Sequence, residues 1–92
     1  PAKYMADAKV TNSLVGDGCV IEGTVENSIL FRRVRVGRNA VVKNSIIMQN
    51  TVIGEEARVD RVICDKNQEV QPEAFLNGKP DAPLCVIQYD IL

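Results

Sequence analysis

The chain has 92 residues, a net charge of −1 and no histidine. This length allows one domain, the charge gives no reason to expect nucleic-acid or anionic-membrane binding, and no apolar run is long enough to cross a membrane. The absence of histidine removes the commonest general base and metal ligand. Without a recognisable secretory signal, Cys19, Cys64 and Cys85 predict reduced, mostly buried thiols in a cytoplasmic protein.

A repeat organises most of the chain. Residues 27–30 (NSIL) recur at 44–47 (NSII), and Val36-Gly37 recurs as Ile53-Gly54, each shifted by 17 residues. A fixed short period of this kind is typical of a solenoid of stacked coils. We expect residues 1–10 to lead into four coils, at 11–25, 26–42, 43–59 and 60–76, each with three short sides.

The composition of each side predicts a narrow interior. Side chains of a strand alternate between two faces, so inward positions lie two residues apart. One inward position of nearly every side carries an aliphatic residue, and the other is mostly small. The expected inward pairs are Ser13 and Val15, Cys19 and Ile21, Gly23 and Val25, Ser28 and Leu30, Val34 and Val36, Ala40 and Val42, Ser45 and Ile47, Thr51 and Ile53, Ala57 and Val59, Val62 and Cys64, Gln68 and Val70, and Ala74 and Leu76. Gln68 must find a polar partner or lie at the end of the stack.

Asparagine and glycine recur where the corners should fall. Asn12, Asn27 and Asn44 share one column, and because asparagine tolerates left-handed backbone and bonds locally, a corner ladder is favoured over a ligand site. The glycines that follow the inward aliphatic residues predict turns with positive φ; they are Gly16, Gly37 and Gly54.

Two segments depart from the period. The side 22–25 (EGTV) is two residues short, so we expect the first coil to be distorted there. Residues 77–83 (NGKPDAP) break the repeat with glycine and proline, and the apolar tail that follows is rich in β-forming residues. We expect the segment 77–92 to cap the last coil as a strand or extended segment, or to meet another domain.

The pattern resembles the hexapeptide repeats of left-handed β-helices, in which an aliphatic residue is followed by glycine and, three positions later, by a small residue. The matching positions are Val15-Gly16 with Cys19, Val36-Gly37 with Ala40, and Ile53-Gly54 with Ala57. The resemblance implies an all-β fold: a single-stranded left-handed parallel β-helix of about four three-sided coils, with an extended C-terminal cap.

A more specific resemblance rests on residues 18–37, GCVIEGTVENSILFRRVRVG, including the short EGTV side. This run resembles the C-terminal domain of bacterial glucose-1-phosphate adenylyltransferase (ADP-glucose pyrophosphorylase), and most of all the regulatory type of subunit in glycogen biosynthesis. The resemblance implies that the chain belongs to a longer protein with an N-terminal nucleotidyltransferase domain. That domain would convert ATP and glucose 1-phosphate to ADP-glucose and pyrophosphate with magnesium.

The resemblance also implies that the β-helix would pack on the nucleotidyltransferase domain, support homo- or hetero-oligomeric assembly and help to transmit allosteric signals. None of the enzyme's catalytic motifs lies in these 92 residues. We therefore expect the chain itself to be catalytically inert and to hold no cofactor or metal.

Two groups of outward residues are candidate sites. Arg32, Arg33, Arg35 and Arg38 lie within seven residues; they can bind a phosphate-bearing effector bidentately, form salt bridges with the other domain, or simply be solvated. Phe31 and Met48 are expected to be exposed in one corner column. Together with the outward residues Ile29, Ile46, Val41 and Val52 they predict a patch that meets another subunit or domain.

Other proteins built from these coils are alternatives. Hexapeptide-repeat acyltransferases form trimers around acyl-CoA sites and generally rely on a catalytic histidine, and β-helical carbonic anhydrases need several histidines to bind zinc. The lack of histidine argues against both. A non-enzymatic scaffold of stacked coils is a further alternative, against which the EGTVENSILF stretch argues by resemblance.

Overall fold

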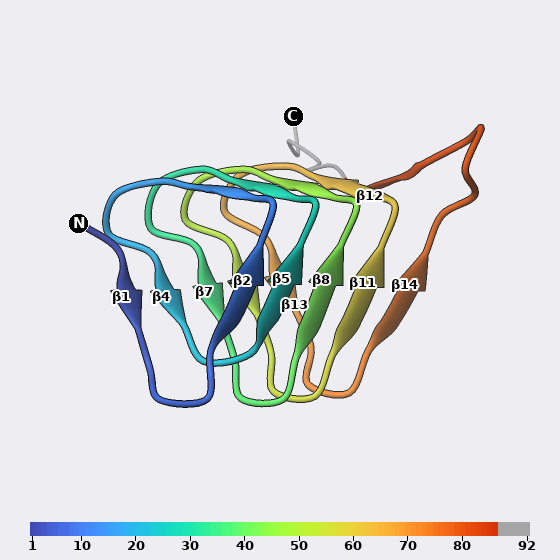
Figure 1. Ribbon diagram of the computed structural model, residues 1–92. Helices are drawn as coiled ribbons and strands as arrows, with labels where there is room; N and C mark the ends of the chain where they lie inside the picture. Colours follow the sequence, from blue (N-terminus) through green and yellow to red (C-terminus); the bar gives the residue numbers. More distant parts are fainter. Residues whose placement is uncertain (87–92) are drawn as a thin grey trace.

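Three parallel sheets form the sides of a triangular prism in the computed structural model, which describes residues 1–86 (Figure 1). Sheet A contains β1 (Lys3–Tyr4), β4 (Val20–Ile21), β7 (Arg35–Val36), β10 (Val52–Ile53) and β13 (Glu69–Val70). Sheet B contains β2 (Lys9–Thr11), β5 (Thr24–Glu26), β8 (Val41–Lys43), β11 (Arg58–Asp60) and β14 (Phe75–Asn77). Sheet C contains β3 (Leu14–Val15), β6 (Ile29–Leu30), β9 (Ile46–Ile47), β12 (Val62–Cys64) and β15 (Leu84–Val86). The chain visits the sheets in turn, which confirms the predicted all-β solenoid.

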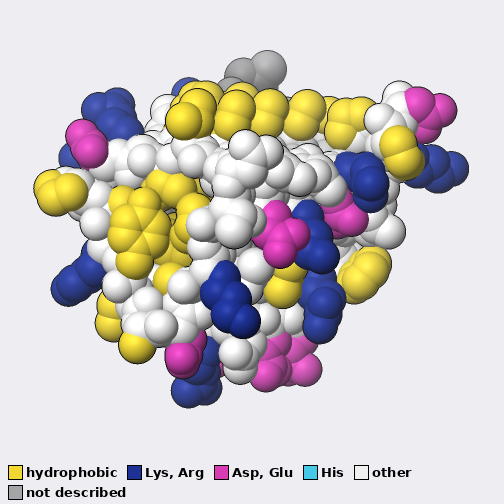
Figure 2. Space-filling view, viewed as in Figure 1, with side chains coloured by type: hydrophobic (Ala, Val, Ile, Leu, Met, Phe, Trp, Pro, Cys, Tyr) yellow, Lys and Arg dark blue, Asp and Glu magenta, His cyan; other side chains and the backbone are white. Residues whose placement is uncertain are grey.

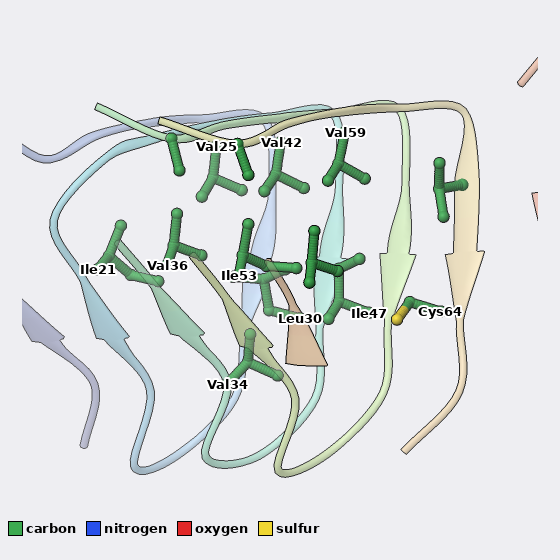
Figure 3. Close-up of a cluster of buried hydrophobic side chains, with 14 of the residues drawn as sticks. Ile21, Val25, Leu30, Val34, Val36, Val42, Ile47, Ile53, Val59 and Cys64 are labelled. Carbon is green, nitrogen blue, oxygen red and sulfur yellow. The ribbon is translucent and has the colours of Figure 1, made fainter. Parts of the chain in front are cut away.

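The core is a column of aliphatic side chains along the axis of the prism. Figure 3 shows Ile21, Val36 and Ile53 of sheet A in one row, facing the row that Val25, Val42 and Val59 of sheet B form. The predicted inward pairs of the middle coils are confirmed as buried, from Cys19 to Cys64. Those near the ends of the stack are in part only half-buried, because no further coil covers them; they are Ser13, Val15, Gln68, Ala74 and Leu76.

A double ladder of polar side chains lines the corner between sheets B and C. The seryl hydroxyl of each coil accepts a hydrogen bond from the next coil: Ser45 N–H donates to Ser28 Oγ (3.1 Å) and Val62 N–H donates to Ser45 Oγ (3.1 Å). Outside them, the predicted asparagine ladder is confirmed. Asn12 Nδ2 donates to Asn27 Oδ1 (2.6 Å), and Asn27 Nδ2 donates to Asn44 Oδ1 (3.3 Å). All three asparagines have positive φ.

The prediction that the corner glycines have positive φ was wrong. Gly16, Gly37 and Gly54 have ordinary φ values, and Gly18 is the one glycine of the described residues with positive φ. Glycine is needed instead because the next coil passes too close for a side chain: a Cβ at Gly54 would lie 2.6 Å from Pro72 N. The left-handed positions fall elsewhere in the corners and are held by non-glycine residues, including Arg33, Asn50 and Asn67.

The short side predicted at 22–25 changes the register between coils. Asn12 and Asn27 are 15 residues apart in their ladder, whereas Asn27 and Asn44 are 17 apart. Gly23 lies in the shortened corner, where its Cα approaches the carbonyl oxygen of Ala40 so closely that no Cβ fits. The chain thus skips two residues of one corner without losing the sheet pairing on either side of it.

The solenoid also includes residues that we expected to lead into it or to cap it. β1 pairs with β4 and β2 pairs with β5, so strands of the stack are already present within residues 1–10. At the other end, β15 pairs in parallel with β12, as expected of a strand over the last coil. The rest of the predicted cap, residues 87–92, lies outside the described residues.

Gly54→Ala tests the close approach of the corners. We expect the free energy of unfolding to fall by about 1–3 kcal/mol because the added methyl group forces the coils apart, as measured by urea denaturation. The matched control is Gly18→Asn, which enters a left-handed column already held by Asn50 and Asn67 and should change stability by less than about 0.5 kcal/mol. The opposite order of the two variants would contradict this account.

Candidate functional site

The outer face of sheet C carries a continuous row of apolar side chains, which we call the apolar ladder. It is formed in register by Leu14, Ile29, Ile46, Ile63 and Cys85. Figure 2 shows a row of hydrophobic side chains along the upper edge of the molecule, where β12 lies in Figure 1. Leu14 is 69% exposed and Ile29 is 39% exposed. A contiguous apolar row on a surface is typical of an interaction site.

The other two outer faces are mixed. The central outward positions of sheet A are Lys3, Val20, Arg35, Val52 and Glu69, and those of sheet B are Lys9, Thr24, Val41, Arg58 and Phe75. Both rows contain charged residues, whereas the apolar ladder contains none. Val41 and Val52 therefore do not join the predicted patch, because they project from other sides of the prism.

The predicted interface residues Ile29, Ile46, Phe31 and Met48 do lie together. Ile29 and Ile46 are opposite each other in sheet C, and Phe31 and Met48 begin the corner that follows it. Phe31 is 42% exposed, but Met48 is half-buried rather than exposed as predicted. Met48 lies between Phe31 of the preceding coil and Asp65 of the next coil. The neighbour of Phe31 in the preceding coil is Gly16, which has no side chain to cover it.

Leu14 and Ile63 extend the ladder in both directions, although neither was among the predicted patch residues. The sequence pattern could have identified them, because Leu14 lies between the predicted inward residues Ser13 and Val15, and Ile63 lies between the predicted inward residues Val62 and Cys64. Their intervening residues must then point outward.

All four candidate arginines project into solvent. Arg35 lies on the outer face of β7, Arg32 and Arg33 lie in the corner before it, and Arg38 lies in the corner after it. Arg38 forms a long ion pair with Glu55 (3.8 Å) in which both side chains are largely exposed; such a pair contributes little to stability. No carboxylate of the described residues lies within salt-bridge distance of the other three guanidiniums.

The cysteines differ in environment. Cys19 and Cys64 are buried and Cys85 is exposed, so the thiols are mostly buried, as expected. Cys85 occupies the outward position opposite Ile63. Burial raises the pKa of the Cys64 thiol above its ordinary value of 9.0. A hydrogen bond with Thr51 opposes this rise in pKa and the nearby charge of Asp65 adds to it.

Within residues 1–86 there is no group of three or more cysteine, aspartate or glutamate side chains placed to hold a metal ion. No helix in the described part of the chain is long and apolar enough to cross a membrane.

The fold, the repeat and the corner glycines define a β-solenoid of the hexapeptide-repeat class. Residues 1–81 match the family described as GlmU-like, C-terminal hexapeptide, and the chain belongs to this family. It is 54% identical to the glycogen biosynthesis protein GlgD of Bacillus subtilis over 86 residues, which cover 94% of this chain and 25% of that protein. It is also 54% identical over 44 residues to glucose-1-phosphate adenylyltransferase of Clostridium botulinum (strain Eklund 17B / Type B), covering 47% of this chain and 11% of the enzyme.

The resemblance predicted from the short side and its flanking residues is thereby confirmed. A second GlgD, from Geobacillus stearothermophilus, is 57% identical over 42 residues, which cover 46% of this chain and 12% of that protein. The chain spans about a quarter of the length of GlgD from B. subtilis.

The raised pKa of the buried Cys64 thiol predicts that the protein loses stability in alkaline solution. Because the folded-state pKa lies above the unfolded-state pKa, the stabilisation by the protonated thiol is complete below about pH 9 and is lost as the pH rises through the folded value. The free energy of unfolding should then fall by at most about 1.4 kcal/mol per pH unit. Urea denaturation between pH 8 and pH 11, at intervals of about one unit, measures this slope.

Cys64→Val should remove that contribution, since valine or another aliphatic residue holds the same inward column in other coils. Cys85→Ser is the matched control, because it removes a thiol that is exposed in the folded protein. An equal slope in wild type and Cys64→Val would contradict the assignment.

Proposed function

We propose that this chain is the C-terminal domain of a longer protein of glycogen biosynthesis, in which it has a structural and regulatory role. The observation that carries the proposal is the match of 94% of the chain to GlgD at 54% identity. The parent protein would contain an N-terminal nucleotidyltransferase domain, and in catalytic members of the family this domain makes ADP-glucose from ATP and glucose 1-phosphate. Magnesium would bind in that domain, and the protein would act in the cytoplasm.

The apolar ladder is the surface through which we propose that the domain docks. A parallel sheet is normally covered on both faces, yet here the outer face of sheet C carries an aliphatic row in which Leu14 and Ile29 are exposed and Ile46 and Ile63 are half-buried. Burying such a row against the nucleotidyltransferase domain removes apolar area from water at about 25 cal/mol per Å². The faces of sheets A and B also expose apolar side chains, such as Val52 and Phe75, but charged residues interrupt both rows and burying them would cost desolvation energy. These two faces would therefore remain solvated or meet other subunits.

Ile29→Lys tests this docking in the longer polypeptide. Burying a lysine in the interface should uncouple the two domains at a cost of about 2 kcal/mol or more, so a single thermal unfolding transition should split into two in calorimetry. The control is Val52→Lys, because Val52 is 38% exposed on sheet A and Ile29 is 39% exposed on sheet C. If the two variants unfold alike, the apolar ladder is not the docking surface.

Self-association through the same face is the competing arrangement. Light scattering of the 92-residue chain over a range of concentrations distinguishes the two, because a monomer at every concentration leaves only docking to the other domain. Oligomer formation that Ile29→Lys abolishes and Val52→Lys does not would instead assign the ladder to contact between copies.

We further propose that Arg32, Arg33 and Arg35 bind a phosphate-bearing effector or an acidic surface of the neighbouring domain. Three exposed guanidiniums without a carboxylate at salt-bridge distance, in the part of the chain that the structure describes, are available for an anionic partner. Arg38 is the weaker member, since Glu55 already lies beside it.

The double variant Arg32→Ala, Arg33→Ala separates these possibilities in the longer protein. If a sugar phosphate acts through this cluster, the concentration for its half-maximal effect on activity should rise about tenfold or more, because bidentate phosphate contacts are lost. Arg58→Ala, an exposed cation on sheet B, is the control. An unchanged response to the sugar phosphate would eliminate the effector role and leave the interdomain contact.

A further inference from the structure

An insertion in the repeat overhangs the apolar ladder at one end. Val62 pairs with Leu84, which lies 22 residues later, whereas Ile46 pairs with Ile63, which lies 17 residues later. The corner between β14 and β15 is therefore longer than the corner between β11 and β12 one coil earlier. Figure 1 shows this segment as an excursion from the stack beyond β14. We call residues 78–83 the overhanging loop. It forms a groove with sheet C that is lined by Ile46 and Ile63, by Pro80 and Pro83, and by Arg61 and Lys79.

Backbone hydrogen bonds tie the overhanging loop to the sheet at both ends and close its tip. Its two ends are anchored on neighbouring residues of the coil below: Gly78 N–H donates to the Asp60 carbonyl (2.8 Å), and Leu84 N–H donates to the Arg61 carbonyl (3.0 Å). Lys79 and Ala82 exchange two backbone hydrogen bonds, at 3.0 and 3.1 Å, which close the tip. Two prolines fix further φ angles. A groove built this way needs little reorganisation to bind a partner.

The same surface occurs two coils earlier without the loop. There the corresponding depression is lined by Asn12, Ser13, Leu14, Asn27, Ser28 and Ile29, with no charged residue and no proline. Ile46 and Ile63 are half-buried, whereas Leu14 and Ile29 are exposed. The overhanging loop therefore adds two prolines and one cation, Lys79, to the lining of an apolar floor that the repeat already supplies. The one carboxylate of the loop, Asp81, is not part of that lining.

The lining of the groove carries two positive charges. Both charged residues of the lining, Arg61 and Lys79, are cations, although the whole chain has a net charge of −1. The Arg61 guanidinium donates a hydrogen bond to Asp60 Oδ2 (3.1 Å), which orients it. The other carboxylate oxygen of Asp60, Oδ1, accepts a hydrogen bond from Asn44 Nδ2 (3.0 Å). Lys79 lies within salt-bridge distance of no carboxylate in the described part of the chain.

We propose that this groove binds an extended peptide segment that places an aliphatic side chain on Ile46 and Ile63 and a neighbouring carboxylate beside Lys79. The proposal deepens the proposed docking function, on which it rests, by naming the chemistry of the segment that covers this end of the apolar ladder. Apolar burial supplies the affinity, and the lysine supplies the preference for an acidic segment.

The test is an NMR titration of the 92-residue chain, labelled at the isoleucine methyl groups, with the peptide acetyl-Ala-Ile-Asp-Ile-Ala-amide. We expect saturable shifts of the Ile46 and Ile63 methyls at millimolar peptide and no shift at Ile29, which lies on the same face outside the groove. The peptide with lysine in place of aspartate should bind about tenfold more weakly because its charge repels the rim.

Lys79→Glu should weaken binding of the aspartate peptide about tenfold, and Lys66→Glu, which makes the same charge change in a different corner, should not. Absence of shifts at Ile46 and Ile63, equal shifts at Ile29, or equal binding of the two peptides would each overturn the proposal. These outcomes are independent of whether Ile29→Lys uncouples the domains of the longer protein, so the two proposals can fail separately.

Discussion

Consecutive coils are joined by parallel backbone hydrogen bonds on all three sides, and this pairing sets a spacing of about 4.8 Å between them. The spacing leaves no room where the backbone turns, so glycine is required at positions such as Gly37 and Gly54. It also brings each seryl hydroxyl level with a backbone N–H of the next coil: Ser28 Oγ accepts from Ser45 N–H and Ser45 Oγ accepts from Val62 N–H, both at 3.1 Å. The corner therefore keeps its hydrogen bonds although the backbone turns away from the sheet.

The inner surface was predictable because it depends only on alternation. Two inward positions on each side, one of them bulky, follow from the pleat of a strand and the width of the bore, and the structure confirms them from Cys19 to Cys64. The same alternation places Ile29 and Ile46 outside. A sequence of this kind therefore predicts both the core and the row that covers one face.

The corners were less predictable because several residue types satisfy them. Asparagine marks the left-handed positions at Asn12, Asn27 and Asn44, but Arg33 and Glu56 take the same conformation without any local signal. Across the insertion, alternation cannot tell where pairing resumes, and so the exposure of Cys85 and the groove beneath Pro80 depend on register that only the structure supplies.

The asparagine ladder ends on a carboxylate, and this termination fixes the orientation of every amide in it. A carboxylate can only accept, so Asn44 must point its Nδ2 at Asp60; its Oδ1 then faces Asn27, and the same choice propagates to Asn12. The aligned amides form a small dipole whose positive end meets the negative charge of Asp60, as a helix N-terminus meets an acidic residue. One ionised side chain thus gives an otherwise symmetrical row of amides a direction along the axis of the solenoid.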